Sequence, residues 1–140
     1  MSKQNVYDNQ ELFDNYARLR EKKENANLLI EMPAILSLFP NLEGKTVLDM
    51  GCGTGILGIL ASKLGAAEVT GIDIDSWCTT NSAENCELNA VSKMQLKLGD
   101  ASLLQKEGQF DLILANINKN ILLADLPQYV KNMRPGSTLI

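Results

Sequence analysis

Short apolar segments and longer helical stripes alternate along residues 45–140 of this chain. Four segments, either continuously apolar or alternating with period two, predict strands at 45–50, 68–74, 94–99 and 110–116. Apolar residues at helical spacing predict helices over 54–64, 76–89 and 118–133. Pro135-Gly136 predicts a turn before a fifth strand that starts at residue 137. This alternation predicts an α/β fold, a Rossmann-like, doubly wound and mostly parallel sheet of about five strands.

The first 41 residues have a different pattern. LFDNYARL and NANLLIEMPAILSLF predict two amphipathic helices, separated by the charged stretch REKKEN, and Pro33 should bend the second. They predict a helical cap on one edge of the sheet or, alternatively, a lid over a ligand site. Because 140 residues suit one domain, we expect a single domain 1–140, with a cap at 1–41 and a core at 42–140.

Composition and charge exclude several function classes. A net charge of -4 argues against a broad basic face for nucleic acid, and no apolar run reaches the ~20 residues that span a membrane. The polar N-terminus MSKQNVYDNQ and three cysteines without a CxxC pair predict a cytoplasmic, reduced protein. The absence of histidine excludes histidine-based triads and nearly all catalytic zinc sites, so we expect no metal.

The segment VLDMGCGTG, residues 47–55, is the strongest candidate site. A strand leads into Gly51, Gly53 and Gly55, and a helix follows at once. Such a loop lets a ligand touch the backbone and directs free N–H groups toward it. The alternative is a tight connection without a ligand.

The charge next to the loop distinguishes two kinds of ligand. Gly53-x-Gly55-x-x-Gly58 matches the dinucleotide fingerprint GxGxxG, and Asp73 follows about 20 residues later, where a ribose-binding acid belongs. However, the Asp49 carboxylate lies just before the loop and would repel a pyrophosphate. It suits a ligand with an ammonium and a sulfonium, which favours S-adenosylmethionine over a dinucleotide.

Residues 45–140 resemble the class I S-adenosylmethionine-dependent methyltransferases, and VLDMGCGTG is similar to their first motif. GILASKLGAAEVTGIDIDSWCTTNSAENCELNAV, GDAS at 99–102 and ANINKNIL at 115–122 are most similar to the bacterial ribosomal protein L11 methyltransferases. The superfamily's sheet has seven strands, so the resemblance implies that the C-terminal strands are missing. The fifth strand would then be an exposed edge open to self-association.

The resemblance implies roles for the residues at the ends of the strands. Its cofactor-binding set is Asp49, Gly51, Gly53, Gly55, Asp73, Ile74, Asp100, Ala101 and Asn116. Asp49 and the backbone of the loop would hold the methionine end, and Asp73 would accept from both ribose hydroxyls. Ile74 would pack on the adenine, whose edge Asp100 and the Ala101 N–H would recognise. Alternatively, Asp73 caps the next helix and Asp100 is a turn residue.

Asn116 ends the fourth strand and is the candidate catalytic residue. Its side-chain oxygen could accept from an amine and point the nitrogen lone pair at the methyl group; the alternative is a local turn. The run Asn116-Ile117-Asn118-Lys119 lacks the Pro-Pro-aromatic of many amino-directed methyltransferases. Positioning and desolvation can accelerate methyl transfer without a histidine base.

Four functions remain open from the sequence. The first is methylation of an amine, by resemblance on a ribosomal protein. The second is methylation of a small metabolite, because YDNQELFDNYARLR and IEMPAILSLFPNLEGKTVLD resemble the N-terminal segment of ubiquinone-biosynthesis-type enzymes, with Tyr7, Tyr16 and Arg20 as lid candidates. The others are an inactive cofactor-binding remnant and a nicotinamide-dependent oxidoreductase domain.

Overall fold

The computed structural model describes residue 34 and residues 37–140. The chain divides into two compact units, Met1–Phe39 and Pro40–Ile140. In the first unit, the Ser37 hydroxyl donates to the Ala34 carbonyl at 2.6 Å. The cap and lid predicted for the N-terminal residues lie outside the described residues, except for these few positions.

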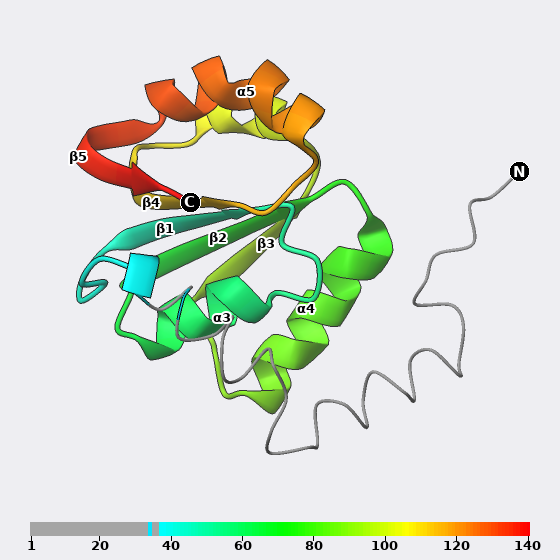
Figure 1. Ribbon diagram of the computed structural model, residues 1–140. Coiled ribbons are helices and arrows are strands. Elements are labelled where there is room, and N and C mark those ends of the chain that lie inside the picture. Colours follow the sequence, from blue (N-terminus) through cyan, green and yellow to red (C-terminus); the bar gives the residue numbers. More distant parts are fainter. Residues whose placement is uncertain (1–33, 35–36) are drawn as a thin grey trace, which may run out of the picture. The chain divides into compact units, whose positions relative to one another are not determined.

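Five parallel strands form the sheet of the second unit (Figure 1). They are β1 (Thr46–Met50), β2 (Glu68–Asp73), β3 (Met94–Leu98), β4 (Phe110–Ala115) and β5 (Met133–Leu139). Their order is β3-β2-β1-β4-β5, and every pairing is parallel. The predicted Rossmann-like sheet is confirmed. From β1 the strands are added outward on one side as β2 and β3, and then on the other side as β4 and β5. Ligands bind in open α/β folds at such a switch point, here between β1 and β4.

Helices cover both faces of this sheet. They are α3 (Ile56–Lys63), α4 (Ser76–Leu88), the 3-10 helix η3 (Ala101–Lys106) and α5 (Lys119–Lys131). Figure 1 shows α5 on one face and both α3 and α4 on the other. Pro127 lies inside a continuous α5. η3 was not predicted from the sequence, because its short apolar segment has no helical period of its own.

The main core lies between the sheet and the layer formed by α5 and η3. Leu48 and Met50 of β1 point into it, together with Ile72 of β2 and Tyr129 of α5. Because side chains alternate along a strand, Asp49 points to the opposite face, toward α3. The period of two therefore places an acid on the α3 face of a central strand.

Helix α4 buries polar and small residues instead of the predicted apolar stripe. Trp77 and Leu88 were expected on that stripe, but they are 51% and 83% exposed. The buried residues of α4 are Ser82 and Cys86. The prediction was wrong because it took every large apolar residue of this helix as core.

β5 starts earlier than the sequence predicted. Phe110 pairs with Met133 and Leu112 pairs with Thr138, so the register shifts between the two pairs. The predicted turn residues, Pro135 and Gly136, lie inside that irregular part of the strand, and Gly136 has a φ of 78°. Among the described residues, β5 pairs with β4 alone and forms an edge of the sheet.

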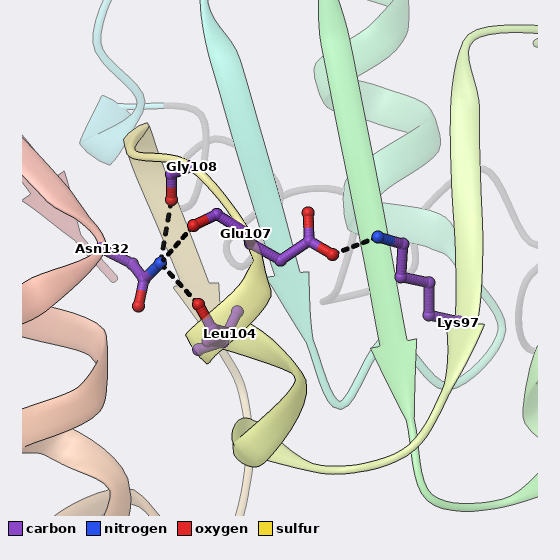
Figure 2. Close-up of polar contacts among 5 residues, drawn as sticks. All are labelled: Lys97, Leu104, Glu107, Gly108 and Asn132. Carbon is purple, nitrogen blue, oxygen red and sulfur yellow. Dashed lines mark hydrogen bonds and ion pairs between the residues drawn. The ribbon is translucent and has the colours of Figure 1, made fainter.

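Asn132, at the end of α5, connects α5 to the segment between η3 and β4 (Figure 2). Its Nδ2 donates to the carbonyls of Leu104, Glu107 and Gly108 at 2.9, 3.4 and 2.8 Å. The Glu107 carboxylate forms an ion pair with Lys97 of β3. This network holds the end of η3 and the segment before β4 at a fixed place along the sheet.

Candidate functional site

The strand register brings the predicted site residues to the carboxyl edge of the sheet. Met50 pairs with Ile72 and with Ala115, so the residues that follow them, Gly51, Asp73 and Asn116, lie at one level. Asp49 lies inside β1 near its end, Gly53 and Gly55 follow β1, and Ile74 follows β2. Asp73 pairs with Leu98, the last residue of β3, so Asp100 and Ala101 follow that strand at the same edge. This edge is therefore the candidate functional site.

The glycine loop, residues 51–55, needs glycine for reasons that differ along it. Gly51, Gly53 and Gly55 have φ values of 68, 55 and 80°, which favour glycine. A Cβ at Gly51 would collide with the Ile117 side chain, and one at Gly55 would lie 3.0 Å from Ser82 Oγ. A Cβ at Gly53 would meet nothing within 4 Å. Gly51 and Gly55 are thus packed against protein, whereas Gly53 faces open space.

The N–H groups of these glycines are not the free donors that the sequence predicted. The Gly51 N–H donates to the Ile72 carbonyl at 2.7 Å, and the Gly55 N–H donates to the Cys52 carbonyl at 2.8 Å. The Gly53 N–H donates to Asp73 Oδ2 at 2.9 Å. The structure corrects the expectation because the turn closes on itself and on β2.

Asp73 joins the glycine loop to the turn after β2. Its Oδ1 accepts from the Asp75 N–H at 3.0 Å, while its Oδ2 accepts from Gly53. Asp75, whose Oδ1 accepts from the Trp77 N–H at 2.8 Å, is the residue that caps α4. Because a carboxylate oxygen can accept two hydrogen bonds, each oxygen of Asp73 keeps one acceptor position.

Asp49 lies beneath the loop and is only 2% exposed. Its Oδ2 accepts from the Gly58 N–H of α3 at 3.0 Å. Burial raises the pKa of Asp49 to about 7, and the charge of Asp73 adds to the rise against the lowering effect of the Gly58 hydrogen bond. Asp49 is therefore a buried acid beneath the loop, without a surface of its own at the edge.

The residues predicted for the adenine differ in exposure. Ile74 is 74% exposed, whereas Ala101 is buried. Asp100 is exposed, and its Oδ1 accepts from the Ser102 N–H at 2.9 Å as the cap of η3. Hydrogen bonds from Ser102 hold the pKa of Asp100 below its usual range. The alternative that Asp100 is a turn residue therefore holds, because it caps η3. Its exposed carboxylate is at the same time an ionised acceptor at the edge.

Asn116 lies exposed at the end of β4, beside the glycine loop. The capping role at the start of α5 belongs to Asn118, whose Oδ1 accepts from the Asn120 N–H at 2.9 Å. Ile117 packs against Gly51. Ile117 and Asn118 therefore make the contacts that form the turn, and the exposed Asn116 is not needed for it.

Two side chains of α4 that the sequence analysis missed also contact the loop. Ser82 is 0% exposed, and its hydroxyl donates to the Gly53 carbonyl at 2.7 Å. Asn85 Nδ2 donates to the Thr54 carbonyl at 2.9 Å. The low apolar content of α4 was a general signal of a helix packed through polar contacts, but it did not indicate which side chains make them.

Two features are absent from the part of the chain that the structure describes, a membrane-spanning helix and a metal-binding cluster. Its helices are all too short or too polar to cross a membrane. Within the same residues, no group of three or more histidine, cysteine, aspartate or glutamate side chains could hold a metal ion.

The polar groups at the carboxyl edge are mainly acceptors. Asp49, Asp73 and Asp100 supply carboxylates, while the N–H groups of the loop glycines are occupied. S-adenosylmethionine brings donors and a net positive charge: an ammonium, a sulfonium, a ribose diol and an exocyclic amine, with one carboxylate beside the ammonium. A pyrophosphate would need donors and would meet carboxylates instead. The residues present fit S-adenosylmethionine and disfavour a dinucleotide.

Known proteins resemble the chain in both sequence and structure. The family model for ribosomal protein L11 methyltransferase (PrmA) matches residues 30–140. A ribosomal protein L11 methyltransferase from Phocaeicola vulgatus is 59% identical over 99 residues, which cover 71% of this chain and 35% of that protein. Another, from Acetivibrio thermocellus, is 45% identical over 92 residues, which cover 64% and 29%.

The crystal structure of a ribosomal protein L11 methylase from Lactobacillus delbrueckii subsp. bulgaricus matches with a TM-score of 0.69 at 34% identity. The match covers 83% of this chain and 59% of that one. The chain spans about a third of the length of the relatives it matches by sequence. The methyltransferase family that the model and these relatives represent implies S-adenosylmethionine as the cofactor.

Proposed function

Because the chain belongs to the ribosomal protein L11 methyltransferase family, we propose that it binds S-adenosylmethionine at the carboxyl edge and methylates an amine of a ribosomal protein. The observation that carries this proposal is the bond from the Gly53 N–H to Asp73 Oδ2. It fixes a carboxylate with free acceptor positions next to the open side of Gly53. The edge thereby offers acceptors to a ligand rich in donors and positive charge.

Each end of the cofactor has its own residues in this proposal. The loop from Gly51 to Gly55, above the Asp49 charge, holds the methionine end, where the ammonium and sulfonium offset the cost of ionising Asp49. Asp73 accepts from the two ribose hydroxyls with the acceptor positions that Gly53 and Asp75 leave. Ile74 packs on the adenine, and Asp100 with the Ala101 N–H recognises its edge.

The chemistry needs little from the protein beyond positioning. S-adenosylmethionine supplies a methyl group already activated by a sulfonium. Asn116, beside the loop and free of the capping role, accepts from the incoming amine and orients its lone pair. An amine must lose a proton before it attacks, and with no histidine in the chain that proton passes to water.

A ribosomal protein is the proposed acceptor because the family and the relatives are named for that activity. These relatives do not favour the small-metabolite alternative. A cofactor-binding domain without turnover remains the second candidate, since the acceptors at the edge would serve binding alone. Association between copies through the β5 edge is a further proposal, supported by the single neighbour of β5 among the described strands.

A labelled-methyl assay tests the proposal. The chain is incubated with methyl-labelled S-adenosylmethionine and purified ribosomal protein L11, and the acceptor is analysed by mass spectrometry. We expect added methyl groups on amines of the acceptor. Asp73→Ala is the matched control and should abolish labelling at low cofactor concentration. Cofactor binding without any labelled acceptor would favour the inactive binding domain.

A further inference from the structure

The backbone on both sides of Gly53 is held by side chains from two different elements. Its N–H donates to Asp73 Oδ2 of β2 at 2.9 Å, and its carbonyl accepts from the Ser82 hydroxyl of α4 at 2.7 Å. One residue later, the Thr54 carbonyl accepts from Asn85 Nδ2 at 2.9 Å. Three backbone groups of two consecutive loop residues are therefore held by side chains.

Ser82 is fully buried, and the hydrogen bond to the Gly53 carbonyl explains why a polar side chain lies there. Placing a hydroxyl in the interior is unfavourable unless it forms a hydrogen bond. The Ser82 hydroxyl bonds the Gly53 carbonyl and also lies 3.8 Å from Cys52 Sγ. Both partners belong to the glycine loop, so the buried position serves the loop and not the apolar core.

The fit between α4 and the loop is close. A Cβ at Gly55 would come within 3.0 Å of Ser82 Oγ and 3.4 Å of Ser82 Cα. Asn85 is held in turn by Asn81, whose Oδ1 accepts from Asn85 Nδ2 at 3.2 Å. Helix α4 therefore supports the loop from behind, while Gly53 keeps its open side toward the edge.

We propose that Ser82 and Asn85 are positioning residues that set the conformation of the glycine loop and thereby the affinity for S-adenosylmethionine, an inference that rests on the proposed function. Neither side chain touches the cofactor. They fix the carbonyls of Gly53 and Thr54 and so limit rotation about Gly53, whose N–H in the preceding peptide donates to Asp73. The carboxylate is thereby aligned before the ribose arrives. A binding site held in its bound geometry gains affinity because less freedom is lost on binding.

Calorimetric titration with S-adenosylhomocysteine, well below the melting temperature of every variant, tests this inference. We expect Ser82→Ala, which removes only the hydroxyl, to raise Kd about tenfold, which corresponds to about 1.4 kcal/mol. Asn85→Ala should raise it about threefold to tenfold. The matched controls are Ser62→Ala and Thr80→Ala, which remove side-chain hydroxyl bonds to carbonyls within α3 and α4. They should stay within about twofold of the original protein.

Amide hydrogen exchange of Gly53, measured without ligand, is the second readout. Ser82→Ala should accelerate it about tenfold or more, with the β1 amide of Val47 unchanged. An unaltered Kd in Ser82→Ala overturns the inference whatever the exchange rate. If the original chain does not bind S-adenosylhomocysteine, the proposed function fails. Exchange then still decides whether α4 orders the loop, and an unchanged Gly53 rate overturns that role.

Discussion

Two buried polar networks of the molecule differ in how many of their hydrogen-bonding positions are occupied by protein partners. Around Asn132, three carbonyls share the Nδ2 group, Gln128 Nε2 donates to Oδ1 at 2.9 Å, and Phe110 N–H donates to its carbonyl at 2.7 Å. Every polar group of Asn132 has a protein partner, and Figure 2 shows the bonds of its Nδ2 group. Around the glycine loop, Asp73 keeps unused acceptor positions, and Asp49 is a buried acid with one backbone donor.

The difference separates a structural network from a binding site. A saturated amide can contribute stability but has nothing left to offer a ligand. Surplus acceptors at an edge cost stability until a ligand with donors or positive charge arrives. The carboxyl edge is therefore the candidate site, and Asn132 is part of the frame that holds η3 and β4 in place.

The largest expected effect concerns the cost of burying Asp49. Its pKa is raised to about 7 in the folded chain, so the folded state holds a proton that the unfolded state releases above about pH 4. Stability should therefore fall as the pH rises from about 4 to 7 and then level off. Asp49→Asn should remove this fall. The unfolding free energy of the variant minus that of the original chain should therefore be up to about 4 kcal/mol larger at pH 8 than at pH 4.

Urea unfolding of both proteins across this pH range measures the effect of Asp49. If the difference in unfolding free energy between the two proteins does not depend on pH, Asp49 is not a buried acid of raised pKa. The site would then carry no such cost, and the contrast with Asn132 would weaken.

Truncation of the saturated network comes next. Asn132→Ala leaves buried carbonyls without a donor and should lower the free energy of unfolding by about 3 kcal/mol. The affinity of the folded protein for S-adenosylhomocysteine should stay the same. Gln128→Ala, which removes a single bond to Asn132, should cost less than about 1 kcal/mol. Weaker ligand binding by folded Asn132→Ala would contradict its purely structural role.

Asn116 should affect the rate and not the fold. Asn116→Ala removes the contact that orients the amine, which is expected to cost about 2–3 kcal/mol of transition-state stabilisation, or roughly thirty- to a hundredfold in rate. Binding of S-adenosylhomocysteine and the melting temperature should stay close to those of the original chain. Methylation at an undiminished rate would leave Asn116 as a loop residue.

Asp73 should affect cofactor affinity more than stability. Hydrogen bonds to a charged acceptor contribute about 1.5–3 kcal/mol, so Asp73→Ala should weaken S-adenosylhomocysteine binding about ten- to a hundredfold. Asp75→Ala is the matched control, because it removes the cap of α4 and should cost about 1 kcal/mol of stability at full affinity. If Asp75→Ala weakened binding while Asp73→Ala did not, the binding carboxylate would be Asp75 and not Asp73.

The sequence predicted the sheet well because its strands are bounded by local signals. β1 lies between Gly44 and Gly51, and the predicted segment 45–50 differs from the observed strand by one residue. Residues at the strand ends could be predicted for the same reason, since parallel strands present their carboxyl ends at one edge.

Long-range contacts explain the errors. Whether a polar side chain is buried depends on what lies opposite, so Ser82 and Asn132 have no local signature. Trp77 looked like core because it is large and apolar, yet α4 packs through Ser82 against a loop 29 positions away. The glycine N–H groups looked free for the same reason, because their acceptors lie on β2 and in the loop's own turn.

Titration of the unmodified chain with S-adenosylhomocysteine and, separately, with NADH tests the central claim most directly. The claim is that the carboxyl edge, rich in acceptors, takes the methyl donor and rejects a pyrophosphate. We expect saturable heat with S-adenosylhomocysteine, weakened by Asp73→Ala, and no binding of NADH. Tight binding of NADH without a response to S-adenosylhomocysteine would contradict the account.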